Sequence, residues 1–423
     1  MADAKKTSPW SWIPTLYVAE GLPYALVLSV SVVFYKNLGI SNEQIAIYTS
    51  WFYLPWVIKP LWSPLVDILK TRRQWIWAMQ FFIGALLAGV ALMIPAPHFF
   101  QLTLAFFWLM AFSSATHDIA ADGFYMLATT EREQAGFSGV RSLFYRVATI
   151  VAQGQLVILA GKIYVRTGNY VEAWSIGFGV MATILICLGA CHFLTLPKPT
   201  ADRPDKTITP ESFFQTFAAF FKKPKIVTLL LFLLFYRLGE AQLVRMVQPF
   251  LLDPRSAGGL GLDDTRVGLI YGTTGVVALM FGGLLGGMVV ARHGLKFWLW
   301  PMLLAIHLPD AVFIWLAYAQ PQNLFAIGAG VAIEQFGYGF GFTAFMLYMI
   351  YIARGGQQTA HYAICTGFMA LGMMLPGRWS GWLQEHLGYQ HFFVWVILAT
   401  IPSFLVALKI PLDAEFGKRN RAN

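Results

Sequence analysis

The stretch PKPTADRPDKTITP, residues 197–210, begins the one long hydrophilic connection in an otherwise apolar chain. It continues into the amphipathic segment ESFFQTFAAFFKKPK, residues 211–225. On each side of this connection the sequence contains six apolar runs, separated by short breaks that carry charged residues, proline or glycine. This arrangement predicts a membrane protein that is built from two six-helix repeats.

Composition supports the same interpretation. The chain has 423 residues, of which 57% are hydrophobic and 12% are charged, whereas a soluble domain carries about twice that charged fraction. Since a spanning helix needs roughly 20 apolar residues, the chain has room for about twelve. The fold class predicted is therefore all-α, integral to the membrane, with twelve transmembrane helices in two six-helix halves. The predicted spans are 11–35, 43–68, 73–95, 99–127, 137–162, 172–195, 226–251, 265–291, 296–319, 323–353, 358–386 and 390–411.

The apolar runs and the charges of the loops predict three segments of the chain and its orientation in the membrane. We expect an N-terminal six-helix bundle at 1–196, a cytoplasmic linker at 197–225 and a C-terminal six-helix bundle at 226–423. Lys and Arg are concentrated in the loops that lie on the side of the N-terminus, which predicts that both termini are cytoplasmic. The net charge of +9 is spread over these short loops, so it does not indicate nucleic-acid binding. The three cysteines form neither a disulfide framework nor a metal site.

Two loops resemble one another and a known signature. After the second span, SPLVDILKTRR (63–73) contains Asp67, Arg72 and Arg73. The matching place in the second half reads GMVVARHGLK (287–296). Both resemble the signature of the major facilitator superfamily between helices 2–3 and 8–9, in which basic residues anchor the loop and an acid pairs across the interface. We expect Asp67, Arg72, Arg73 and also Arg141, near the cytoplasmic end of its helix, to form the gating and signature-loop group.

Ionisable groups inside a bilayer cost several kcal/mol and usually face a cavity or a partner. Proton-coupling candidates are acids that take up and release a proton, and substrate-cavity candidates are polar groups that hold the solute. A second interpretation is structural. In it, an aspartate of the predicted span 99–127 would pair with Arg141 or Arg146, and Arg237 would pair with Glu240. The proton-coupling candidates are Asp118, Asp122, Glu240 and Glu20. The substrate-cavity candidates are Arg237, Arg146, Tyr145, Glu334, Lys59, Tyr338 and Asp310.

Several stretches resemble the AmpG-type muropeptide permease branch of the major facilitator superfamily, which is related to acetyl-CoA transporters. The strongest is SSATHDIAADGFY (113–125), which keeps Asp118 and Asp122 but has His117 where the family has Gln. EGLPYALV (20–27), WVIKPLWSPLVD (56–67) and YRLGEAQ (236–242) also match family segments, and the similarity follows the order of nearly the whole chain.

The resemblance implies a proton-coupled symporter with a central cavity that works by alternating access. It would import a sugar-containing solute, foremost a muropeptide such as N-acetylglucosaminyl-anhydro-N-acetylmuramic acid, across the bacterial inner membrane in peptidoglycan recycling. The expected partners are this small-molecule glycan, protons and the lipid bilayer. We expect a monomer and no cofactor, metal or nucleic acid.

Three alternatives stay open. The chain could be a facilitator-type importer of another oligosaccharide or of an acyl-CoA-like solute. It could be a sensor with a transporter fold. It could also be a membrane-embedded acyltransferase, which would use the adjacent His117–Asp118 pair, although adjacent residues point to different faces of a helix. The sequence contains no nucleophile elbow, Walker sequence, dinucleotide fingerprint or metal-ligand cluster, which indicates that the chain is not an enzyme.

Overall fold

The computed structural model describes residues 8–204, 210–354 and 358–417, and within these ranges every regular element is a helix and none is a strand. The predicted all-α fold class is thus confirmed. The chain forms two compact units. Unit 1 comprises residues 1–34 and 61–209, and unit 2 comprises residues 35–60 and 210–423. The boundaries predicted at residues 196 and 226 remain a prediction, and the structure adds that residues 35–60 pack with the second unit.

Ten helices in the described ranges are long and apolar enough to cross a bilayer. One of them, Ala360–Ala407, has 48 residues and covers the last two predicted spans. Gly388, with a φ of 68°, bends this helix and divides it near the predicted boundary. The other nine are Pro9–Asn37, Arg72–Met93, Phe99–Ala128, Val140–Thr167, Tyr170–Thr195, Ile226–Leu252, Asp264–His293, Leu295–Ala319 and Leu324–Ala353.

The second predicted span, 43–68, is two helices rather than one. α3 (Asn42–Trp51) ends just before Phe52, and α4 (Leu54–Leu69) begins two residues later. Pro55 explains the break, because it has no N–H to donate to the carbonyl of Trp51 and its ring crowds that carbonyl.

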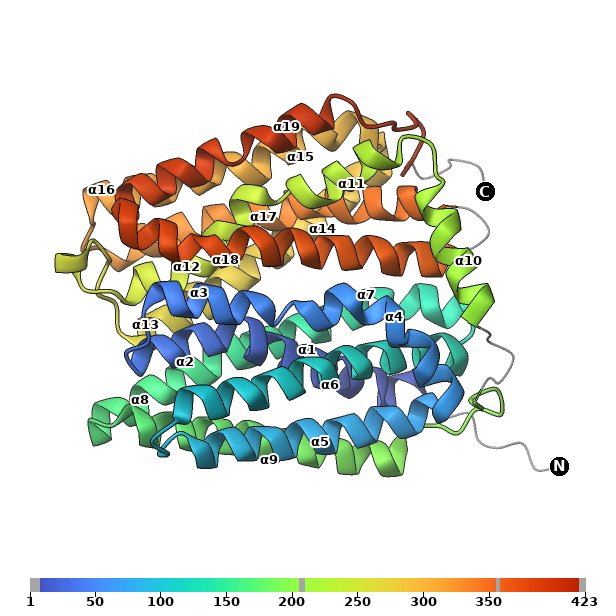
Figure 1. Cartoon of the computed structure of the whole chain (residues 1–423), viewed down its shortest axis with the longest axis horizontal. Helices are drawn as coiled ribbons and strands as arrows, with labels where there is room; N and C mark the ends of the chain where they lie inside the picture. The colour runs from blue at the N-terminus through green and yellow to red at the C-terminus, as the bar shows by residue number, and fades with distance from the viewer. Residues whose placement is uncertain (1–7, 205–209, 355–357, 418–423) are drawn as a thin grey trace. The chain divides into compact units, whose positions relative to one another are not determined.

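Unit 1 is a bundle in which α5 packs against both α6 and α9, and α1 packs against α6 and α7 (Figure 1). α5 begins at a capping box, in which Thr71 and Gln74 satisfy each other's backbone N–H groups. One buried cluster of the unit includes Trp12, Tyr17 and Phe124. The helices that lie wholly in unit 1 are α1 (Ile13–Ala25), α5 (Arg72–Met93), α6 (Phe99–Ala128), α7 (Glu131–Thr149), α8 (Val157–Thr167) and α9 (Tyr170–Thr195), with π-helical turns at Leu26–Val30 and Ile150–Leu156. α2 (Ser31–Asn37) and α4 each contribute residues to both units.

Unit 2 is organised around α17, which packs against α14 and α15, and around α18, which packs against α3 and α12 (Figure 1). Two of its apolar runs are interrupted, one between α11 and α12 and the other by a 3-10 turn at Leu308–Asp310. Its helices are α3, α10 (Pro210–Phe221), α11 (Ile226–Phe235), α12 (Leu238–Leu252), α13 (Asp264–Val267), α14 (Val276–His293), α15 (Leu295–His307), α16 (Ala311–Ala319), α17 (Leu324–Ala353), α18 (Gln358–Leu398) and α19 (Ile401–Ala407).

Candidate functional site

Three of the predicted carboxyl groups come together in unit 1, and we call them the unit 1 trio. Glu20 projects from α1, whereas Asp118 and Asp122 lie one turn apart on α6 and therefore share a face of that helix. Each residue offers an oxygen that lies within 4.8 Å of the others. Glu20 is 7% exposed, but 44% of the Asp122 side chain is exposed. The trio thus joins a buried acid to an accessible one.

Arg141 of α7 completes this cluster. Its guanidinium forms an ion pair with Asp122 and lies over the rings of Tyr17 and Tyr125, 4.4 and 4.3 Å from their centroids. The Tyr17 hydroxyl donates to Asp122 Oδ1 at 3.2 Å. The predicted contact between Arg141 and an aspartate of the fourth predicted span, which is α6 in the structure, therefore exists. One guanidinium beside three carboxyl groups leaves an excess of negative charge, and bound protons would relieve it.

A buried hydrogen-bonded chain starts beside the unit 1 trio at His117. The Gln80 amide nitrogen lies 2.8 Å from Nε2 of His117, and the Gln80 amide oxygen lies 2.8 Å from Nδ1 of His192. Nε2 of His192 lies 3.0 Å from the Thr15 hydroxyl. Gln80 and His192 have no exposed surface, and His117 is 1% exposed. This chain ties α1, α5, α6 and α9 together, so we expect it to stabilise unit 1.

Gln80→Leu is expected to lower the free energy of unfolding by roughly 2–4 kcal/mol, because it leaves ring nitrogens of His117 and His192 buried without partners. The measurement is the thermal unfolding midpoint of the purified protein, followed by tryptophan fluorescence. The exposed Gln101→Leu, on α6, is the matched control. Equal midpoints for Gln80→Leu and the wild type would contradict a stabilising role for the chain.

Unit 2 contains a second group of three carboxyls, the unit 2 trio. Glu240 lies in the first turn of α12, Asp310 ends the 3-10 turn before α16, and Glu334 lies in α17. Their carboxylate oxygens also converge within 4.8 Å of one another. The three residues are 0%, 1% and 2% exposed, respectively. The interruptions of the helices place two of these acids, a device that membrane transport proteins use at ion and substrate sites.

Arg237 stands at the break between α11 and α12, with a non-helical φ of −116°. Its Nη2 donates to the Tyr338 hydroxyl, and its guanidinium lies 5.0 and 4.9 Å from the ring centroids of Tyr338 and Phe342. Both carboxylate oxygens of Glu240 lack a hydrogen-bond partner, so no hydrogen bond joins Glu240 to Arg237, and the structural pair of these two residues stays a prediction. Each unit therefore combines an acid trio with an arginine on two aromatic rings.

The signature-loop residues Arg72 and Arg73 connect the start of α5 to other segments of unit 1 through hydrogen bonds. Asp202 accepts hydrogen bonds from the backbone N–H groups of Arg72 and Arg73, at 2.8 and 3.1 Å. The Arg72 side chain donates to the carbonyl of Gly123 in α6 at 3.3 Å, and that of Arg73 donates to the carbonyl of Leu196 at 3.1 Å. The sequence interpretation missed Asp202, because no local pattern shows that the segment after α9 returns to the start of α5.

The other predicted residues are dispersed. The Tyr145 ring packs against that of Tyr24, with centroids 6.2 Å apart, in unit 1. Arg146 in α7 and Lys59 in α4 are half-buried. The side chain of Asp67 lies outside the described residues, so its predicted role stays a prediction.

Arg245 on α12 was overlooked, although it lies in an apolar span and the filter for intramembrane charge selects it. It is 1% exposed. Its guanidinium donates to the hydroxyl and to the carbonyl of Thr49, at 3.0 and 3.1 Å, and lies 5.1 Å from the centroid of Tyr53. These contacts tie α12 to α3 within unit 2.

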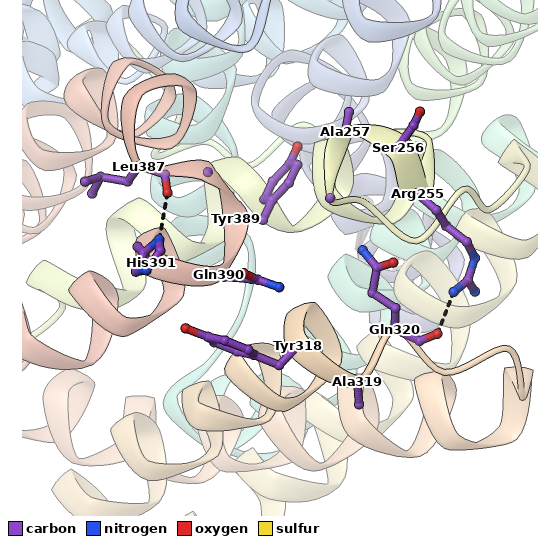
Figure 2. Close-up of a pocket in the computed structure, with 12 residues that line it drawn as sticks. Arg255, Ser256, Ala257, Tyr318, Ala319, Gln320, Leu387, Tyr389, Gln390 and His391 are labelled. Atoms are coloured by element: carbon purple, nitrogen blue, oxygen red, sulfur yellow. Dashed lines mark hydrogen bonds between the residues drawn. The ribbon is translucent and has the colours of Figure 1, made fainter.

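A pocket of about 530 Å³ opens at the loops of unit 2 (Figure 2). Arg255 donates to the Gln320 carbonyl at 2.5 Å, and Nδ1 of His391 lies 3.1 Å from the Leu387 carbonyl oxygen. Figure 2 marks both contacts with dashed lines. These polar groups thus already bind backbone. The lining residues, none of which was a predicted site residue, are 255–258, 318–320 and 387–391.

Comparison with known proteins gives a consistent result. The family model described as Major Facilitator Superfamily matches residues 15–244. A Rickettsia conorii protein that carries the name AmpG 4 is 27% identical over 412 residues, which cover 93% of this chain and 94% of the relative. The anhydromuropeptide permease of Escherichia coli is 26% identical over 413 residues, which cover 95% of this chain and 79% of the permease.

Solved structures share the fold. The nucleoside transporter NupG superposes with a TM-score of 0.68 at 13% identity, covering 95% of this chain and 99% of that one. A D-xylose–proton symporter superposes with a TM-score of 0.68 at 12% identity, covering 97% and 98%. At these identities the likeness concerns the arrangement of helices alone.

Proposed function

Because the chain belongs to the Major Facilitator Superfamily, and is a transporter of that type, we propose that it imports a muropeptide together with protons by alternating access. The family also confirms that the chain is not an enzyme, which removes the acyltransferase alternative. The chain is a multi-pass membrane protein, and we place it in the bacterial inner membrane with both termini in the cytoplasm. The proposed solute is N-acetylglucosaminyl-anhydro-N-acetylmuramic acid, with or without its peptide.

The observation that carries the proton coupling is the unit 1 trio with Arg141. Asp122 pairs with Arg141, and two further carboxyl groups lie within 4.8 Å, so a proton that moves from one of them to Asp122 weakens the ion pair. The side chains of both partners are partly exposed, 44% for Asp122 and 28% for Arg141. We therefore assign proton uptake and release to Asp118 and Asp122, with Glu20 as the buried member of the same cluster.

The substrate assignment has two supports. Relatives that bear the names AmpG and anhydromuropeptide permease align along nearly the whole chain. In addition, Arg237 lies over two aromatic rings of α17 and combines a cation for a carboxylate with rings for the face of a sugar. We assign recognition of the solute to Arg237 and Tyr338, and we retain Arg146, Tyr145 and Lys59 as further candidates.

The test is uptake by proteoliposomes that contain the purified protein. Labelled N-acetylglucosaminyl-anhydro-N-acetylmuramic acid is supplied outside, and an inward proton gradient is imposed. We expect accumulation inside the vesicles that a protonophore abolishes. Uptake that ignores the gradient would overturn the coupling, whereas no uptake by folded and inserted protein would discard the muropeptide and favour another oligosaccharide or an acyl-CoA-like solute.

A further inference from the structure

The unit 2 trio differs from the unit 1 trio in how its charges are satisfied. In unit 1, Asp122 has an ion pair with Arg141 and accepts a hydrogen bond from Tyr17. In unit 2, all four carboxylate oxygens of Glu240 and Asp310 are buried without a hydrogen-bond partner. Each cluster therefore contains three acids. The carboxylates of Glu240 and Asp310 in unit 2 have no hydrogen-bond partner, whereas Asp122 in unit 1 has two partners.

The polar groups beside the unit 2 trio leave the carboxylates of Glu240 and Asp310 without a hydrogen bond. Glu334 accepts from the amide of Gln335, at 3.3 and 3.0 Å. Arg237 donates to the Tyr338 hydroxyl rather than to Glu240. A buried carboxylate that no donor meets costs several kcal/mol. Since the oxygens of three acids converge on one place, a single small cation can satisfy them together.

We propose that Glu240, Asp310 and Glu334 form a sodium-binding site. Carboxylate oxygens are ligands for hard cations, and the trio offers neither nitrogen nor sulfur to a transition metal. One carboxylate oxygen from each residue lies within 4.8 Å of the other two, so a single ion placed between them can contact all three.

The enclosed position of the unit 2 trio favours sodium over the commoner divalent ions. Magnesium retains several waters when it binds to proteins, and calcium takes six to eight oxygens. Side chains that are 0–2% exposed leave little room for such a hydration shell. The site belongs to unit 2 alone and is independent of the proposed proton site in unit 1.

The experiment uses the full chain in detergent without any muropeptide, so its outcome does not depend on the proposed substrate. Binding of ²²Na⁺ is measured by scintillation proximity, and the thermal unfolding midpoint is measured in NaCl and in choline chloride of equal ionic strength. We expect saturable ²²Na⁺ binding that unlabelled Na⁺ displaces, and a midpoint that rises with Na⁺ concentration because the ion binds to the folded state.

Glu240→Gln and Asp310→Asn are each expected to abolish both signals, and Asp263→Asn, in an exposed pair with Arg266, is expected to keep them. If the neutral variants do not fold, Glu240→Asp and Asp310→Glu keep the charge and are expected to lower the sodium affinity at least tenfold. Absence of saturable binding by the wild type would overturn the proposal, as would displacement by Ca²⁺ alone. Loss of binding in Asp118→Asn but not in Glu240→Gln would place the ion in unit 1 instead.

Discussion

Asp118→Asn combined with Asp122→Asn is expected to reduce proton-driven accumulation of the muropeptide to the level of liposomes without protein. An amide keeps the size of the carboxyl group but neither binds nor releases a proton near neutral pH. The double variant leaves Glu20 in the unit 1 trio, but Glu20 is buried and loses the accessible acid beside it. Arg141 also loses its ion-pair partner.

Two assays separate coupling from folding. Uptake is measured with an inward proton gradient, and equilibrium exchange of labelled for unlabelled solute is measured without one. We expect the double variant to lose the first and to retain the second, because exchange requires the carrier to reorient with solute but no net proton movement. Asp263→Asn, in the exposed Asp263–Arg266 pair of unit 2, is the matched control and should retain both.

Accumulation by the double variant equal to that of the wild type would remove Asp118 and Asp122 from the coupling mechanism. Tyr17→Phe provides a graded version of the same test. It deletes the hydroxyl that donates to Asp122 Oδ1 but keeps the ring under Arg141. We therefore expect a shift in the pH dependence of uptake with this variant and no loss of exchange.

The apolar runs predicted the membrane fold well, because a bilayer demands about 20 apolar residues for each span. The spacing of Asp118 and Asp122 likewise predicted a shared face, since helical periodicity is a local property. The breaks were harder to predict. Pro55 divided a span that the sequence pattern treated as continuous, and the turn at Leu308–Asp310 interrupts another.

Contacts between distant segments were beyond the reach of sequence patterns. Glu240, Asp310 and Glu334 were all selected as ionisable groups in spans, but they were assigned to different roles. Their convergence within 4.8 Å depends on how α12, the turn before α16 and α17 pack, which no local pattern encodes. Tyr17 was missed for a similar reason, because an aromatic residue in an apolar run is usually packing and its contact with Asp122 spans more than a hundred positions.

Gly339→Ala is expected to have the largest effect on folding, because it separates two helices of unit 2. A Cβ atom on Gly339 of α17 would overlap the backbone carbonyl of Leu279 in α14, and one on Gly282 of α14 would overlap the carbonyl of Phe336 in α17. Small residues allow membrane helices to approach this closely. Overpacking costs roughly 1–3 kcal/mol even where side chains can yield, and a backbone carbonyl yields less.

Gly287→Ala is the matched control for this prediction. Gly287 lies on the same helix as Gly282, but a Cβ there has no neighbour within 4 Å, so alanine should be neutral or stabilising by up to about 1 kcal/mol. The measurements are the monodisperse yield on size exclusion and the thermal unfolding midpoint. Gly282→Ala and Gly339→Ala widen the same interface, so their combined effect should be smaller than the sum of the two. A Gly339→Ala protein with the yield and midpoint of Gly287→Ala would show that α14 and α17 tolerate a wider separation than their glycines indicate.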